Sequence, residues 1–223
     1  WYKTKFTAPK NSKDKRLLLH FGAVDWQSTI YINGNELNTH KGGYDPFYVD
    51  ITDHLKKGQQ ELVVRVWDPT DEGPQPRGKQ VKNPNSIWYT PVTGIWQTVW
   101  LETVNIGHIE NINPVAGIDN NMISIETGVK DAKEGDQLKI SISEGGNNIA
   151  EEIINAGAIA EVKLKDAKRW SPANPFLYDL KIQLVRNGQV LDEVGSYFAM
   201  RKISLSPDKN GVQRLMLNNE FLF

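Results

Sequence analysis

Hydrophobic positions along this chain either gather in short runs or recur at every second residue, and neither pattern has a helical period. In the first half, 17–21 (Leu-Leu-Leu-His-Phe) and 61–67 (Glu-Leu-Val-Val-Arg-Val-Trp) are apolar runs of strand length. Another run, 29–32, leads into Asn33-Gly34, a dipeptide that favours a tight hairpin turn, and 96–101 closes the series. These segments predict an all-β first domain.

The second half shows a stricter alternation. Residues 138–142 and 180–184 each place leucine or isoleucine at every second position, with lysine, serine or glutamine between them. Asn187-Gly188 marks a hairpin into a strand at 190–194. Further strands are expected at 122–129, 148–154, 160–164 and 196–205. About seven strands of this kind are typical of an immunoglobulin-like sandwich.

Aromatic residues divide the chain into two unequal parts. Fourteen of the 21 Phe, Trp and Tyr residues, among them six of the seven tryptophans, precede Val104. The later part relies on Trp170 as its one large anchor. This shift predicts two cores of different character, with a boundary near 103–107.

Composition narrows the function classes. A formal net charge of −1 gives no bulk electrostatic attraction to nucleic acid, so no nucleic-acid partner is expected. No apolar run reaches the roughly 20 residues of a membrane-spanning helix, so no membrane span is expected. The absence of cysteine excludes disulfides, thiolate zinc sites and cysteine nucleophiles.

Several motifs occur in one consistent order. Gly-Gly-Tyr-Asp-Pro-Phe at 42–47 is followed by Thr-Gly-Ile-Trp at 93–96. Later come Trp-Ser-Pro-Ala-Asn-Pro-Phe-Leu-Tyr at 170–178 and Phe-Ala-Met-Arg-Lys-Ile at 198–203. Together they resemble the N-terminal domains of glycoside hydrolase family 2, the β-galactosidase, β-glucuronidase and β-mannosidase group.

The resemblance implies an all-β fold in three parts. Residues 1–104 would form a jelly-roll sandwich of the galactose-binding type, and 105–206 an immunoglobulin-like β-sandwich. Residues 207–223 would begin the segment that leads into a catalytic TIM barrel absent from this chain. The family hydrolyses β-glycosides with retention, using two glutamates. The resemblance places both glutamates on the barrel, so the chain alone is predicted to be inactive.

The same resemblance implies a role and partners. The chain would be the N-terminal fragment of a β-galactosidase-like enzyme in carbohydrate degradation, bracing the barrel and shaping its entrance. Its partners would be its own barrel domain, the carbohydrate substrate and further copies in a homo-oligomer. Family habit favours the bacterial periplasm or the extracellular space, although no signal peptide is visible in this chain.

Five residues are candidates for binding or junction roles. In several family members a loop before the Gly-Ile motif contributes to sugar binding, and here that loop carries Asn83, Asn85, Trp88 and Tyr89. The rings would stack on a sugar and the amides would hydrogen-bond its hydroxyls, the alternative being that Trp88 packs against a neighbouring domain. Arg201 matches the family's arginine at the junction with the barrel, where a guanidinium ties strands to carboxylates.

The sequence contains few groups of candidate ligands for a metal ion or cofactor. Asp68, Asp71 and Glu72 lie in a loop at 68–78 with three prolines, which is expected to hold a shape of its own. Their oxygens could bind a structural calcium, but a solvated loop is the alternative and the spacing matches no known calcium loop. Asp45 and Asp50 are expected to accept backbone hydrogen bonds in turns. The four histidines lack ligand spacing, so no metal site and no cofactor are predicted.

Two other function classes remain open. A stand-alone carbohydrate-binding module would grip glycans without hydrolysis, and sugar binding by the isolated chain would favour it. A structural or adhesion protein of sandwich domains is the third interpretation. The apolar segment at 215–223 argues against it, because an exposed Phe-Leu-Phe tail would be an aggregation liability.

Overall fold

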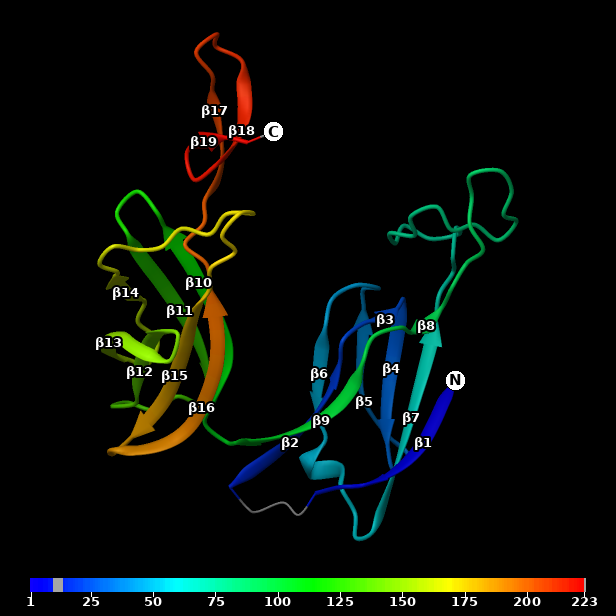
Figure 1. Cartoon of the computed structure of the whole chain (residues 1–223). Coiled ribbons are helices and arrows are strands. Elements are labelled where there is room, and N and C mark those ends of the chain that lie inside the picture. The colour runs from blue at the N-terminus through cyan, green and yellow to red at the C-terminus, as the bar shows by residue number, and fades with distance from the viewer. Residues whose placement is uncertain (10–13, 223) are drawn as a thin grey trace. The chain divides into compact units, whose positions relative to one another are not determined.

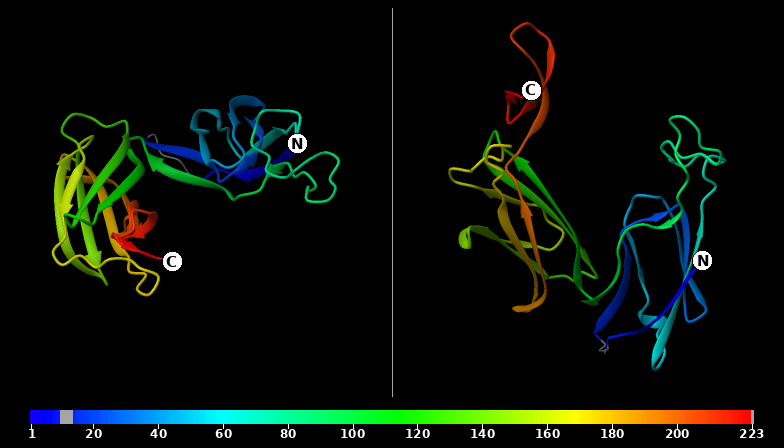
Figure 2. Two further views of the ribbon diagram at one scale, coloured as in Figure 1. Left: turned by 90° about the horizontal axis from the view of Figure 1, so that it is seen from above. Right: turned by 45° about the vertical axis from the view of Figure 1, so that its right-hand side comes forward.

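The computed structural model describes residues 1–9 and 14–222. The chain forms two compact units, Trp1–Val104 and Asn105–Phe223, each built of β-sheets in which antiparallel pairing dominates (Figures 1 and 2). The described residues contain no α-helix and a single short 3₁₀ turn. The all-β class predicted from the sequence is therefore confirmed.

The first unit is a sandwich of two sheets with a small third sheet at its edge. The larger sheet has the order β1-β7-β4-β5, the second has the order β6-β2-β9, and β3 pairs with β8. Its elements are β1 (Tyr2–Thr7), β2 (Lys15–Phe21), β3 (Val24–Asp25), β4 (Gln27–Ile32), β5 (Asn35–Lys41), β6 (Phe47–Asp50), η1 (Thr52–His54), β7 (Gln59–Trp67), β8 (Gly94–Ile95) and β9 (Val99–Asn105).

The core of the first unit lies between the two larger sheets. The apolar run of β2 is central in its sheet, and Leu17, Leu19 and Phe21 are each at most 2% exposed. They pack with Ile30 and Ile32 from β4 of the facing sheet. A run that is apolar on both faces suits a central strand because both of its faces are covered.

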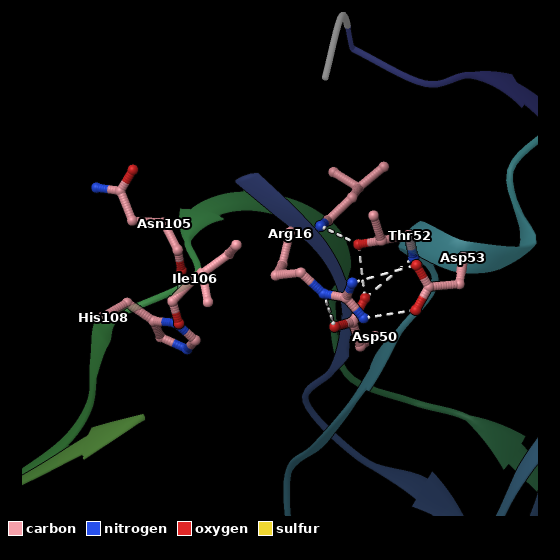
Figure 3. A network of polar contacts seen from close by, with 8 residues as sticks. Arg16, Asp50, Thr52, Asp53, Asn105, Ile106 and His108 are labelled. Carbon is pink, nitrogen blue, oxygen red and sulfur yellow. Dashed lines mark hydrogen bonds and ion pairs between the residues drawn. The ribbon is translucent and has the colours of Figure 1, made fainter. Parts of the chain in front are cut away.

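A hairpin and a polar network fix the geometry of this unit. Asn33 (φ 52°) and Gly34 (φ 86°) link β4 to β5 in a two-residue turn, as the sequence predicted. Elsewhere the Arg16 guanidinium contacts Asp50 at 2.6 Å and Asp53 at 2.8 Å, so β2 is tied to the end of β6 and to η1 (Figure 3). Asp50 also accepts a hydrogen bond from the backbone of Thr52, the turn role expected of it.

The second unit contains a sandwich of seven strands and a separate hairpin. One sheet has the order β10-β11-β14, and the other has the order β13-β12-β15-β16. The hairpin β17–β18 gains a third short strand, so the separate sheet has the order β17-β18-β19. Its elements are β10 (His108–Gly117), β11 (Met122–Lys130), β12 (Gln137–Glu144), β13 (Asn147–Asn155), β14 (Ala160–Lys163), β15 (Tyr178–Arg186), β16 (Gln189–Phe198), β17 (Ile203–Pro207), β18 (Gln213–Leu217) and β19 (Glu220–Phe221).

The alternation read from the sequence forms the core of this sandwich. Strands β12 and β15 are antiparallel neighbours, and their register places Ile140 opposite Ile182 and Leu138 opposite Leu184. All four side chains are 0% exposed. The hairpin at Asn187-Gly188 is also present, with φ values of 50° and 76°.

Two strand boundaries differ from the sequence-based expectation. The strands expected at 190–194 and 196–205 are one strand to Phe198, followed by a break before β17. The break occurs because the Met200 carbonyl accepts a 3.1 Å hydrogen bond from the backbone N–H of Trp170, a residue distant in the sequence. The strand expected at 96–101 begins only at Val99 and continues to Asn105.

The hairpin β17–β18 exposes an apolar face. Leu205 lies directly opposite Leu215, and Ile203 lies opposite Leu217. Ile203, Leu205 and Leu215 are 65%, 70% and 65% exposed. We call Ile203, Leu205 and Leu215 the hairpin face.

Candidate functional site

A long loop, residues 68–93, joins β7 to β8 and extends beyond the strands of the first unit (Figure 1). The Asp68 carboxylate accepts hydrogen bonds from the Thr70 backbone and from the Thr93 hydroxyl, both 2.8 Å long, and so joins the two ends of the loop. The side chain of Gln75 is buried and donates to the Thr70 carbonyl at 2.9 Å. These bonds give the loop the shape of its own that its prolines predicted.

Two segments of the loop run side by side. The Tyr89 backbone donates to the Lys79 carbonyl at 2.8 Å, and its own carbonyl accepts from the Val81 backbone at 3.2 Å. Gln80 and Tyr89 therefore form an isolated parallel bridge. This bridge holds the aromatic pair 88–89 beside the basic residues of 77–79.

The structure brings all four predicted loop residues to the exposed part of this loop. Trp88 and Tyr89 are 39% and 62% exposed. Arg77 lies over the Trp88 ring at 5.8 Å and Lys79 lies over the Tyr89 ring at 5.9 Å, both measured to the ring centroid. Asn83 and Asn85 are exposed, and the Asn85 amide donates to the Asn83 carbonyl at 3.4 Å. The sequence placed these residues in one loop, but it did not predict the cation–ring pairs.

The three carboxylates considered for calcium have other partners. Asp68 holds the loop ends together, Asp71 lies 3.7 Å from Arg77, and Glu72 forms a 2.5 Å ion pair with Lys82. Across residues 1–9 and 14–222, no three acidic or histidine side chains are grouped so that they could hold a metal ion. The calcium interpretation thus receives no support from the geometry.

Two of the sequence motifs meet where this loop leaves the sandwich. Strand β3 pairs with β8 so that Asp25 lies opposite Gly94. The Trp96 indole donates a 2.7 Å hydrogen bond to the Gly43 carbonyl, and its ring meets the edge of Tyr44 at 5.9 Å. A Cβ at position 43 would lie 2.7 Å from a carboxylate oxygen of Asp25, so any larger residue there would push the Asp25 side chain aside.

Asp25 is a feature of this region that sequence reasoning missed. Burial raises the pKa of its carboxyl, and the nearby charge of Asp68 raises it further. Tyr44 and Trp96, beside it, are 58% and 51% exposed. Nothing in the local sequence around Asp25 marks it as a chemical group, because its burial and its proximity to Asp68 arise only from the fold.

Arg201 lies in the second unit, apart from the loop residues in the sequence. Its guanidinium lies 5.1 Å from the centroid of the Trp170 ring. Both residues line a cavity of about 390 Å³ together with Leu177 and Tyr197, which are 46% and 64% exposed. This arrangement leaves the planar cation of Arg201 on an aromatic surface, open to a partner.

No helix in the described part of the chain is long and apolar enough to cross a membrane.

Comparison with known families gives two matches that follow one another along the chain. Residues 1–112 match the family described as "Glycosyl hydrolase 2 galactose-binding domain-like". Residues 109–201 match the family described as "Glycosyl hydrolases family 2". The first sandwich is thus of the galactose-binding, jelly-roll type, and the second is the immunoglobulin-like domain of the same family.

Individual relatives agree with these matches. The chain is 27% identical over 220 residues to a β-galactosidase of Thermoanaerobacter pseudethanolicus, covering 93% of this chain and 29% of the relative. It is 28% identical over 213 residues to a putative β-glucuronidase of Formosa agariphila, covering 92% of this chain and 19% of the relative. The chain thus spans less than a third of the length of either relative.

Solved structures show the same partial coverage. A β-glycosidase from Bacteroides vulgatus superimposes with a TM-score of 0.79 at 25% identity, covering all of this chain and 28% of that protein. A β-glucuronidase from an uncultured Clostridium gives a TM-score of 0.78 at 28% identity, covering all of this chain and 37% of that protein.

Proposed function

The chain belongs to glycosyl hydrolase family 2, and from this premise we propose that it forms the N-terminal β domains of a retaining, β-galactosidase-like glycosidase. The observation that carries the proposal is the succession of two family domains in one chain, the first at 1–112 and the second at 109–201. The relatives are several times longer, which leaves room in them for a catalytic domain. β-Galactoside cleavage is the activity proposed for the parent enzyme.

These domains are proposed to support catalysis rather than perform it. Retaining glycosidases need two carboxyl groups about 5–5.5 Å apart, one as nucleophile and one as acid/base. No carboxylate of this chain matches the family positions of either. The chain alone therefore braces the barrel and shapes its entrance.

The hairpin face is the proposed contact with the barrel. Its side chains project from a hairpin that follows the second sandwich and contributes little to that sandwich's core. An exposed ladder of leucine and isoleucine gains free energy when another apolar surface covers it. Arg201 precedes this hairpin, and its guanidinium is proposed to bind a carboxylate of the barrel at the junction.

The loop at 68–93 is proposed to contact the sugar. Trp88 and Tyr89 present exposed rings, and Asn83 and Asn85 present exposed amides that can hydrogen-bond hydroxyl groups. The internal hydrogen bonds of the loop support this role, because a pre-ordered loop loses less entropy on binding.

Hydrolysis assays test the proposal directly. The 223-residue chain and the full-length product of its gene would be assayed on p-nitrophenyl β-galactoside, β-glucuronide and β-mannoside, with product stereochemistry followed by NMR. We expect no turnover by the chain, and retaining hydrolysis by the full-length product with β-galactoside fastest. Fastest cleavage of another glycoside would refute the β-galactosidase assignment, and an inactive full-length product would refute the enzyme proposal.

A second candidate is a stand-alone carbohydrate-binding module. The exposed rings of Tyr44, Trp88, Tyr89 and Trp96 on the first unit favour it. It requires that the full-length gene product bind glycans without hydrolysing them, so the same assay separates the two functions.

A further inference from the structure

The loop at 68–93 carries more than aromatic rings, because a cation lies over each of the exposed rings of Trp88 and Tyr89. Arg77 pairs with Trp88 and Lys79 pairs with Tyr89 at nearly equal distances of 5.8 Å and 5.9 Å. The backbone bonds between Tyr89 and Lys79 fix the two pairs next to each other. The result is two neighbouring ring–cation pairs, which we call the basic row.

The positive charges in this row are unequally compensated. Lys82, nearby in sequence, is neutralised by Glu72 at 2.5 Å. Arg77 has only a long contact with Asp71 at 3.7 Å. For Lys79, the described residues supply an aromatic neighbour but no acidic group within ion-pair distance. Lys79 therefore leaves a positive charge beside a ring that is 62% exposed.

This combination suits a sugar that carries a negative charge. Each cation lies over one face of its ring, so a pyranose packs its C–H face on the opposite face or displaces the cation, and a carboxylate or sulfate at the edge of that sugar then attracts the cation. Nucleic acid is a poorer fit, since the chain has a net charge of −1 and the basic row is limited to a few residues. Neutral sugars would use the rings but leave the cations without a role.

We propose that residues 77–89 form a binding site for anionic glycans, in which Trp88 and Tyr89 stack on sugar rings and Lys79, assisted by Arg77, binds a uronate carboxylate or a sugar sulfate. The proposal rests on the proposed function only in taking this loop as a carbohydrate-contacting surface. It adds a charge preference that the galactoside assignment does not contain.

Calorimetric titration of the 223-residue chain tests this site with three matched ligands. The first is a β-linked oligosaccharide containing glucuronic acid, the second is its carboxyl-reduced neutral counterpart, and the third is a sulfated oligosaccharide of equal length. The anionic ligands should bind roughly threefold to fivefold more tightly than the neutral one, the scale of an exposed charge pair. Because the cations are exposed, this preference should shrink as sodium chloride is raised from 20 to 300 mM, ionic strengths at which the Debye length falls from roughly 20 Å to below about 8 Å.

Three substitutions test whether the effect belongs to the loop. Lys79→Gln should remove the preference for charge and leave binding of the neutral ligand unchanged. Lys57→Gln, an equal charge change at an exposed turn between η1 and β7, should keep the preference. Trp88→Ala should weaken the binding of all three ligands to a similar extent. Circular dichroism verifies that the variant retains its fold.

The outcomes separate this proposal from the proposed function. Equal affinity for anionic and neutral ligands would overturn the charge preference, while the sugar contact proposed for the loop would stand. Absence of binding by every ligand would overturn the site in this chain, and the hydrolysis assay would still decide the parent activity. If Lys57→Gln removed the preference for anionic ligands as fully as Lys79→Gln, the proposed site would also be overturned. The preference would then come from the net charge of the chain.

Discussion

The indole nitrogen of Trp96 donates a 2.7 Å hydrogen bond to the carbonyl oxygen of Gly43. This bond joins the Thr-Gly-Ile-Trp motif to the Gly-Gly-Tyr-Asp-Pro-Phe motif, and the pairing of β3 with β8 lies beside it. These two motifs thus form one structural unit at the base of the 68–93 loop. Their spacing in the sequence reflects the two chain segments that must meet there.

Trp96→Phe should destabilise the first unit. Phenylalanine keeps an aromatic ring but removes the donor, so the Gly43 carbonyl loses its partner at a cost of about 1 kcal/mol. Urea unfolding followed by circular dichroism measures the loss. Trp88→Phe is the control, because that tryptophan lies in an exposed loop. Equal destabilisation by both substitutions would show that the Trp96–Gly43 bond has no special contribution.

Arg16→Lys should also weaken the first unit, through a different contact. The guanidinium reaches Asp50 with one nitrogen and Asp53 with the others, a forked arrangement that a single ammonium group cannot reproduce (Figure 3). We expect a loss of about 1 kcal/mol in the free energy of unfolding. The control is Lys3→Gln, which breaks the exposed pair with Glu61 and should change stability by less than about 0.5 kcal/mol. A loss no larger for Arg16→Lys than for this control would contradict the prediction.

Local sequence patterns predicted the parts of the fold that depend on local rules. The Asn-Gly turns at 33–34 and 187–188 follow from the positive φ that such a turn requires. The alternation at 138–142 and 180–184 follows from the burial of one face of each strand in the core. The break after Phe198 did not follow, because it depends on a backbone bond from Trp170 to Met200.

The candidate site also has a part that the local sequence predicted and a part that depends on the fold. Proximity in the sequence was sufficient to group Asn83, Asn85, Trp88 and Tyr89 in one loop. The pairing of Tyr89 with Lys79 depends on how the loop folds back on itself, which no local pattern specifies. The raised pKa of Asp25 depends on burial and on Asp68, 43 positions later in the printed sequence.

Asp136→Asn should show a stability difference that depends on pH. The Arg186 guanidinium, bonded to both carboxylate oxygens at 2.7 Å, and the Lys133 backbone hold the pKa of Asp136 at about 2, despite the opposing effect of burial. A carboxyl whose pKa is lowered on folding stabilises the protein above its unfolded pKa of 3.8, and this contribution is lost as the pH falls toward 2.

The expected result is a loss of roughly 1.5 to 3 kcal/mol at pH 7, the range for hydrogen bonds to a charged group. Urea titrations at pH 7, 4 and 2.5, read from NMR signals of β12 and β15, would follow the second unit separately. The difference between the original chain and the variant should narrow below pH 4. A difference that stays constant over this range would mean that the charge of Asp136 does not stabilise the fold.

Substitutions in the hairpin face should leave the stability of this chain unchanged but should destabilise the longer enzyme. Ile203→Ser replaces a side chain that is 65% exposed here, so the free energy of unfolding of the 223-residue chain should change by less than about 0.5 kcal/mol. If the barrel covers this face, the same substitution should cost the full-length gene product about 2 kcal/mol, the scale of burying one isoleucine. Ile149→Ser is the matched control, since Ile149 is 45% exposed on β13 of the sandwich and should be neutral in both proteins. Neutral behaviour of Ile203→Ser in the full-length product would rule out this face as the contact with the barrel, whereas selective destabilisation there would place the contact on the hairpin.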